Sequence, residues 1–495
     1  MPLFNNTRDD WFGNIRADVL AGIVVALALI PEAIGFSIIA GVDPAVGLWA
    51  SVAIAIIIAF TGGRPGMISA ATASVAVLVG PLVRDHGVEY LFAATILMGL
   101  FQIIAGLLRL NLLMQFVSRS VITGFVNALA ILIFMAQIPQ LIDVTWHTYA
   151  MIAGGLGIIY LFPRITTAVP SPLVSILVLS ALSIGLGLPV HTVSDMGDLP
   201  SGLPSFGLPD VPLTWATLRI IAPTAGAMAA VGLLESLLTA QIVDDMTDTD
   251  SYKRYECRGQ GIANIGAALF GGMGGCAMIG QSVINVTSGG RGRLSSFVAG
   301  AFLFVLLAIL GPWVGQVPMP SLVAVMIMVS IGTFSWNSIP NLRRHPWQSS
   351  VVMVTTVVVV VATNDLSLGV GAGVLLSGIF FAQKVQRLFR VEREISADGQ
   401  VATYRVSGEI FFASVHRFIE QMEAANETAP HVMIDMTHAH LWDISSVDAL
   451  DKIVGKLDKG GASVKVIGYN EASADIVDKF ALHDKTGFEL GTVPH

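Results

Sequence analysis

Long apolar runs separated by short polar loops dominate the first 390 residues. Runs of this kind cross a bilayer as helices, which need about 20 mostly apolar residues. The pattern predicts fourteen membrane segments in two sets of seven. The first set covers 17–40, 43–62, 69–83, 88–110, 116–137, 148–163 and 172–189. The second set covers 214–243, 259–272, 277–289, 294–314, 317–336, 348–363 and 367–385.

Two of these segments are too short and too rich in glycine to cross the membrane as continuous helices. Residues 271–290 read GGMGGCAMIGQSVINVTSGG, which predicts an extended entry and a half-length helix that begins near Ala277. Residues 66–83 show the same pattern, with small residues before a short apolar run that Gly80 and Pro81 are expected to end. Irregular backbone at membrane depth is tolerated only where protein buries it or where it lines a wet cavity.

The two short segments occupy corresponding places in the two sets. Such a pair is the best sequence pointer to a transporter binding site. The N-terminus of a helix presents free N–H groups and a partial positive charge. We therefore predict that the two half-helices face each other, N-terminus to N-terminus, with an anion between them. The alternative is that both segments are small-residue faces that let helices pack closely.

The composition is that of an integral membrane protein with a soluble C-terminal part. Charged residues make up 13% of the chain, whereas soluble domains carry about 25%. Residues 1–383 hold 15 of the 27 Lys and Arg, and the last 112 residues hold the other 12. No basic patch suggests nucleic acid as a partner. Cys257 and Cys276 are too few for a disulfide framework and are interpreted as packing residues.

The distribution of positive charge predicts the orientation in the membrane. If the N-terminus is cytoplasmic, 13 of the 15 Lys and Arg before residue 384 lie inside, and Arg84 and Arg219 are the exceptions. This asymmetry follows the positive-inside rule and predicts a multi-pass inner-membrane protein with both termini cytoplasmic. Because each set has an odd number of segments, the two sets are expected to be inverted repeats. The predicted parts are a cytoplasmic N-terminus (1–16), the first repeat (17–189), an extracytoplasmic loop (190–213), the second repeat (214–388) and a C-terminal domain (389–495).

The C-terminal part is predicted to be a small α/β domain. Strand-like stretches lie at 401–407, 409–413, 431–437 and 463–469. Val447, Leu450, Val454 and Leu457 recur at helical spacing between the last two stretches. Alternating strands and helices are typical of a sheet covered by helices.

Two carboxylates lie well inside predicted membrane segments, away from their ends. Glu32 follows Pro31 in the first segment, and Glu235 lies in the middle of the eighth. A charged group there costs roughly 2.5–3.5 kcal/mol on insertion scales, so it is usually paired, protonated or wet. Both are candidates for proton coupling. For Glu32 the alternative is a structural acceptor for a kinked backbone, and for Glu235 it is a static partner of the broken segment.

Motifs of other function classes are absent. The glycine-rich stretch lacks G-K-[ST], and the chain has no H-E-x-x-H and no Cys/His cluster. We therefore expect a protein that is not an enzyme and that needs no metal ion or cofactor.

Several motifs resemble the sulfate permease family, also called solute carrier family 26. They are PEAIGFSIIAGVDPAVGLWAS, ESLLTAQIVDD, GQGIANIGAALFGG and SVINVTSGGRGRLS, and the C-terminal part resembles a STAS domain. The resemblance implies an α-helical polytopic fold of seven plus seven inverted segments, with core and gate domains, dimeric assembly and anion transport.

The resemblance also implies a set of substrate-binding residues. They are Glu32, Phe36, Thr72, Ala73, Ile279, Gly280 and Gln281. Family members commonly have Gln where this chain has Glu32, and some animal members have Arg where it has Gln281. A carboxylate beside an anion site repels the anion unless it is protonated. This departure favours proton coupling over plain exchange.

The function predicted from the sequence is proton-coupled symport of a small anion, by alternating access around a site between half-helices three and ten. A dicarboxylate such as fumarate is favoured over bicarbonate or sulfate. The alternatives are an anion exchanger or channel without proton coupling, and a proton-coupled nucleobase transporter. The expected partners are the anion, protons, the lipid bilayer, a second copy of the chain and a cytosolic partner of the STAS domain.

Overall fold

The computed structural model describes residues 8–110, 117–166, 170–196, 204, 206–363, 365–422 and 427–481. Parts of the predicted N-terminal region, of the 190–213 loop and of the C-terminal domain lie outside these ranges, as does residue 116 of the fifth predicted segment. The chain divides into two compact units, Met1–Val374 and Leu375–His495.

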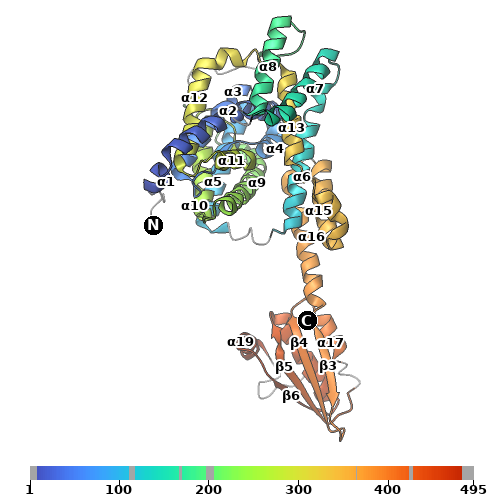
Figure 1. Cartoon of the computed structure of the whole chain (residues 1–495). Helices are drawn as coiled ribbons and strands as arrows, with labels where there is room; N and C mark the ends of the chain where they lie inside the picture. Colours follow the sequence, from blue (N-terminus) through green and yellow to red (C-terminus); the bar gives the residue numbers. More distant parts are fainter. Residues whose placement is uncertain are drawn as a thin grey trace. The chain divides into compact units, whose positions relative to one another are not determined.

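Helices lie at all fourteen predicted membrane segments (Figure 1). Among the described residues, seven helices are long and apolar enough to cross a membrane. The first seven are α2 (Ile15–Ala40), α3 (Pro44–Thr61), α4 (Ala73–His86), α5 (Val88–Leu107), α6 (Arg119–Met135), α7 (Trp146–Leu161) and α8 (Ser171–Leu186). The second seven are α9 (Trp215–Thr247), α10 (Lys253–Leu269), α11 (Ile279–Thr287), α12 (Arg293–Val314), α13 (Met319–Thr333), α15 (Trp347–Thr363) and α16 (Leu366–Gln386). Within the described residues of the first unit, two short α-helices were not predicted, α1 (Arg8–Phe12) and α14 (Ser338–Arg344).

The helices of the two sets pack in equivalent pairs. α5 packs on α10 as α12 packs on α3, and α2 packs on α12 as α9 packs on α5. Likewise α4 packs on α9 as α11 packs on α2, and α6 packs on α15 as α13 packs on α7. In these pairs, the contacts of a helix are repeated by its counterpart seven segments later. This is the arrangement of an inverted repeat.

Small residues allow the closest of these contacts. A Cβ atom on Gly99 of α5 would lie 2.5 Å from the carbonyl oxygen of Gly261 in α10, and the reverse distance is 2.4 Å. Two backbones can approach so closely only through glycine. Close packing of this kind therefore joins continuous helices of the two repeats.

The two broken segments meet in a short ribbon. Strand β1 (Ser69–Ala71) pairs antiparallel with β2 (Gly275–Ala277), and Ala70 lies opposite Cys276. Helices α4 and α11 begin just beyond these strands. The expectation that Gly80 and Pro81 end the first half-helix was wrong, because α4 continues to His86. A proline removes one helical hydrogen bond, and the rest of the helix continues around it.

The second unit is the predicted α/β domain (Figure 1). Its sheet has the order β3 (Arg390–Ile395), β4 (Val401–Ile410), β5 (His431–Leu441) and β6 (Ser463–Ile467). β3 and β4 are antiparallel and the other pairs are parallel. The helices are α17 (Val415–Gln421), α18 (Ile444–Lys459) and α19 (Glu471–Phe480). The stretch predicted at 401–407 and the first two residues of the stretch predicted at 409–413 form one strand, β4, which ends before residue 411. Strand β3 was not predicted.

One ion pair with a buried carboxylate joins the sheet of this unit to the segment before β5. The Glu427 side chain, 1% exposed, accepts hydrogen bonds from Arg393 Nη2 at 2.8 Å and Arg393 Nε at 2.9 Å. It also accepts one from the Tyr404 hydroxyl. The Arg393 guanidinium, helped by Tyr404, lowers the pKa of Glu427 from 4.5 to about 2. The ionised carboxylate therefore stabilises the folded unit.

The close approach of the paired strands β1 and β2 gives the first testable prediction. A Cβ atom on Gly275 would lie 1.9 Å from the carbonyl oxygen of Ala70. Gly275→Ala should therefore destabilise the protein by about 1–3 kcal/mol through overpacking, measured by thermal unfolding in detergent. Gly154→Ala is the control, because a Cβ there meets nothing within 4 Å. Equal stability of the two variants would contradict the ribbon.

Glu427 gives a pH-dependent prediction. Its pKa is lowered on folding, so its contribution is present above pH 4.5 and is lost as the pH falls towards about 2. Glu427→Gln should lower the stability of the unit by about 1.5–3 kcal/mol at pH 7 and remove that acid-dependent loss. Hydrogen exchange of β4 in the full-length protein measures both effects. Glu420→Gln, at an exposed position, should change neither, and identical profiles for the two variants would refute the role of Glu427.

Candidate functional site

A stripe of three polar side chains on α10 holds the β1–β2 ribbon in place. Glu256, Gln260 and Asn264 follow one another at intervals of four residues, so they share one face of the helix, and all three are fully buried. Asn264 Nδ2 donates to the Gly275 carbonyl oxygen at 3.1 Å, and the Gly275 N–H donates to Asn264 Oδ1 at 2.8 Å. Gln260 Nε2 donates to Ser69 Oγ at 2.7 Å. Each strand of the ribbon is therefore fixed by one of these amides.

The same stripe holds the loop before β1. Glu256 Oε2 accepts hydrogen bonds from the Gly63 N–H at 2.7 Å and the Arg64 N–H at 3.2 Å. Buried backbone N–H groups need such partners. The loop that leads from α3 into the ribbon is thus set by a side chain of the second repeat.

Both half-helices begin with unpaired backbone amides. Neither Thr72 before α4 nor Met278 before α11 caps its helix with a side-chain hydrogen bond. The first helical bonds run from the Ala76 N–H to the Thr72 carbonyl and from the Ser282 N–H to the Met278 carbonyl. The N–H groups of the first turn therefore have no partner within the helix. Such ends attract anions.

Glu235 of α9 lies at the N-terminus of α4. Its carboxylate accepts hydrogen bonds from the Ser74 hydroxyl and, at 3.2 Å, from the Cys276 thiol. Thr72 Oγ1 lies 3.2 Å from Cys276 Sγ and 3.2 Å from Ser74 Oγ. Side chains from α4, α9 and β2 thus form one polar cluster around this carboxylate.

Glu32 of α2 lies at the N-terminus of α11. Its half-buried side chain interacts with the buried side chain of Gln281, the third residue of α11. Gly280 beside it is exposed, and a Cβ atom there would meet nothing within 4 Å. The space in front of the first turn of α11 is therefore open.

The two carboxylates occupy equivalent positions in the two repeats. α2 is the counterpart of α9, and α4 is the counterpart of α11. Glu32 of the first repeat faces the half-helix of the second repeat, and Glu235 of the second repeat faces the half-helix of the first. Each short helix therefore starts beside one carboxylate of the opposite repeat.

The remaining predicted residues have different surroundings. Thr72 belongs to the Glu235 cluster, and Ala73 and Ile279 begin the two half-helices. Phe36 is buried in the main core of the first unit; its role as a wall of the site stays a prediction.

Sequence reasoning missed three features of this region. Cys276 was interpreted as a packing residue, yet its thiol contacts the Glu235 cluster. Ser74 was noted only as a small residue. The stripe of Glu256, Gln260 and Asn264 was not identified, although its four-residue spacing is visible in the sequence.

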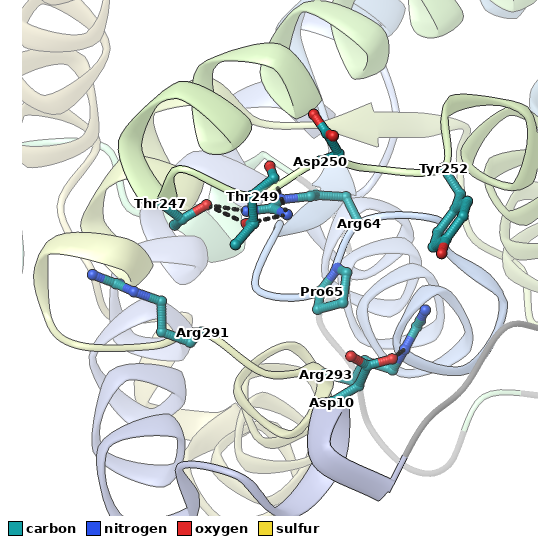
Figure 2. A pocket seen from close by; sticks show the side chains of 9 residues that line it. All are labelled: Asp10, Arg64, Pro65, Thr247, Thr249, Asp250, Tyr252, Arg291 and Arg293. Carbon is teal, nitrogen blue, oxygen red and sulfur yellow. Dashed lines mark hydrogen bonds and ion pairs between the residues drawn. The ribbon is translucent and has the colours of Figure 1, made fainter.

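A network of arginines ties the two repeats together at the ends of the helices (Figure 2). Arg64 Nη1 donates to Thr249 Oγ1 at 2.9 Å, and Arg64 Nε lies 3.3 Å from Asp244 Oδ1. Arg293 donates to the carbonyl oxygens of Ala59 and Gly62 at 3.1 and 2.8 Å. Arg64, Thr249 and Arg293 border a cavity of about 250 Å³. Because loops after α3, α9 and α11 converge here, the network fixes them as one body.

Profiles of known families match most of the chain. The profile described as sulfate permease family matches residues 15–152 and 144–358. The chain belongs to the sulfate permease family. The profile described as STAS domain matches residues 392–492, so the second unit is a STAS domain.

Relatives of this member of the sulfate permease family match nearly its whole length. The putative sulfate transporter YbaR of Bacillus subtilis is 58% identical over 478 residues, which are 96% of this chain and 98% of YbaR. The bicarbonate transporter BicA of a Synechocystis species is 25% identical over 505 residues, 92% of this chain and 89% of BicA.

Two solved structures share the fold. The transmembrane domain of a cyanobacterial BicA matches with a TM-score of 0.67 and 25% identity, over 75% of this chain and all of that domain. The murine anion transporter Slc26a9, in its inward-facing state, matches with a TM-score of 0.82 and 16% identity, over 96% of this chain and 88% of its own. The second likeness shows the fold alone. Family membership makes the protein an anion transporter of this family and not an enzyme.

The open space at Gly280 gives a prediction for transport. Gly280→Val adds a side chain at the first turn of α11, where its Cβ atom would meet nothing within 4 Å. It should leave thermal stability unchanged and lower anion uptake into proteoliposomes at least about ten-fold, the cost of about 1.4 kcal/mol. Gly185→Val in α8 is the control, because it is equally open. Normal uptake by Gly280→Val would exclude the first turn of α11 from the substrate path.

Proposed function

We propose that the protein is a proton-coupled anion symporter whose substrate binds between the first turns of α4 and α11. The observation that carries the proposal is the pairing of each half-helix with a carboxylate of the opposite repeat, Glu32 with Gln281 of α11 and Glu235 with Ser74 of α4. The amide groups of each first turn attract the anion, and each carboxylate repels it unless a proton neutralises the charge.

The size of the electrostatic repulsion between carboxylate and anion accounts for the proposed coupling of anion binding to proton binding. Two unit charges 4 Å apart interact by about 4 kcal/mol at an effective dielectric constant of 20. Removal of one charge by a proton would then raise anion affinity by a factor on the order of 10³. By linkage the anion raises proton affinity by the same factor. The two ligands therefore bind together and are carried together.

The candidate substrates are small oxyanions. Relatives named as sulfate and bicarbonate transporters make these two anions the first to test. Dicarboxylates such as fumarate remain candidates, since two half-helix N-termini could each bind one carboxylate.

The proposed setting is the inner membrane, with both termini cytoplasmic and two copies of the chain in the assembly. The clustering of Arg64, Arg119, Arg291 and Arg343 in loops on one predicted side supports this orientation. A cytosolic partner of the STAS domain is also proposed, from the presence of that domain.

The experiment that tests the function is uptake into proteoliposomes of sulfate, bicarbonate, fumarate, succinate, chloride and uracil, with and without an inward proton gradient. Accumulation of one anion only with the gradient would establish symport. Uptake that ignores the gradient but requires an internal anion would replace symport by exchange. Accumulation of uracil would replace the anion by a nucleobase.

Glu32→Gln provides the residue-level prediction. The amide keeps the hydrogen-bonding shape but cannot exchange a proton, so gradient-driven accumulation should be lost while anion exchange between the two sides is retained. Asp85→Asn, at an exposed position in α4, is the control. If Glu32→Gln still accumulates anion against its gradient while Glu235→Gln does not, the proton is carried by Glu235 alone. Accumulation by both variants would refute the coupling role.

A further inference from the structure

A second polar cavity lies away from the half-helices, where α6 and α15 begin and α14 lies beside them. Its volume is about 160 Å³. α6 packs on α15 along this side of the first unit, as Figure 1 also shows. Arg119, Ser120, Ser338, Asn341, His345 and Ser349 line it from three helices and the loop before α15.

The lining is rich in hydrogen-bond donors and has no carboxylate among the described residues. Within the described part of the chain, the side chains of Arg119 and His345 make no hydrogen bond or ion pair. The hydrogen bonds of these two residues run through backbone atoms only. A guanidinium group of this kind is available for a bidentate contact with an anion.

Ser338 supplies a buried donor to the same cavity. It is 5% exposed, and its hydroxyl oxygen accepts a hydrogen bond from Asn127 Nδ2 at 2.8 Å. Asn127 Oδ1 in turn accepts the Ser335 N–H at 2.8 Å, so the amide is fixed. The Ser338 hydroxyl proton has no acceptor among the residues described, although a buried donor usually has one. The acceptor it lacks would sit in the cavity.

The larger cavity of Figure 2 differs in this respect. Its arginines are already engaged, Arg64 by Asp244 and Arg293 by Asp10, and Asp250 also lines it. An anion there would compete with carboxylates. The smaller cavity is therefore the better anion site.

We propose that the cavity between α6, α14 and α15 binds a phosphate group. A phosphate offers several acceptor oxygens to the Arg119 guanidinium, the His345 ring N–H and the Ser338 hydroxyl. The N-termini of α6 and α15, each 17 residues long, add a favourable field for negative charge.

The phosphate could come from two sources, a phospholipid headgroup or free inorganic phosphate. Trp336 and Trp347 stand exposed on either side of α14, and exposed tryptophans gather at the headgroup level of membranes. The cavity involves α6, α14 and α15 rather than α4 and α11, so its occupancy is independent of the proposed symport.

Two binding measurements on the detergent-purified full-length protein test the proposal. The first is equilibrium dialysis of delipidated protein with radiolabelled inorganic phosphate. The second is native mass spectrometry with phosphatidylglycerol, compared with diacylglycerol, which lacks the phosphate. Arg119→Gln should weaken binding at least about ten-fold, since a charge-assisted hydrogen bond is lost.

Companion variants separate binding in this cavity from unfolding, from general charge effects and from binding at the substrate site. Ser120→Asp adds a carboxylate to the cavity at the first turn of α6, a position that favours helix formation, so its loss of binding would not reflect unfolding. Arg164→Gln removes an equal charge from an exposed position outside the cavity and should bind as wild type. Gly280→Val should also retain this phosphate, which distinguishes it from a phosphate at the substrate site.

The proposal is decided by which variants lose phosphate binding and in which of the two measurements. Loss in dialysis identifies free phosphate as the ligand, and loss only in mass spectrometry identifies the headgroup; either supports the site. Binding by Arg119→Gln and Ser120→Asp equal to wild type in both measurements would overturn it. An equal loss in Arg164→Gln would also overturn it, because the effect would then be one of general charge.

Discussion

The structure of the first unit depends on two places at membrane depth where the helical backbone is interrupted. Each interruption leaves N–H and C=O groups that neither lipid nor a continuous helix can satisfy. The β1–β2 ribbon pairs some of them, and the α10 stripe of Glu256, Gln260 and Asn264 binds others. Once these groups are satisfied, the starting points of α4 and α11 are fixed.

Because the N-termini of α4 and α11 are fixed, the carboxylates beside them can influence what binds there. A half-helix N-terminus attracts negative charge whether that charge is a side chain or a substrate. Glu32 and Glu235 each stand beside such a start, so in the proposed symport the side chain and the substrate compete for the same field. In that proposal a proton ends the competition by removing the side-chain charge. Because the repeats are equivalent, the proposal has the same competition once in each repeat.

Much of this architecture was predictable because hydrophobic periodicity and glycine content are local signals. The fourteen segments and the half-helix near Ala277 followed from them. The sequence motifs indicated the family and the STAS domain, and both were confirmed. Helix α14 was missed because its seven residues, SIPNLRR, have no apolar periodicity. Strand β3 was missed because its residues, RVEREI, are mostly charged and exposed, and only pairing with β4 defines the strand. The predicted end of α4 was wrong because Gly80 and Pro81 were taken as a helix end, whereas the helix continues past Pro81 to His86.

The site was less accessible to sequence reasoning because it depends on contacts between distant residues. Glu32 and Gln281 are far apart in the chain, as are Ser74 and Glu235, which meet only because the repeats interlock. The thiol of Cys276 joins the cluster through strand register, since Cys276 lies opposite Ala70. Spacing within one helix could have pointed to the α10 stripe, but nothing local pointed to Cys276.

The most direct measurement is the position of a bound anion. Anomalous diffraction from crystals grown with selenate, a heavy analogue of sulfate, would locate it without assumptions about transport. We expect one selenium peak within hydrogen-bonding distance of first-turn amides of α4 or α11, near Ala73 or Gly280. An ordered selenate elsewhere in the membrane region, with none at these helix starts, would contradict the proposed site.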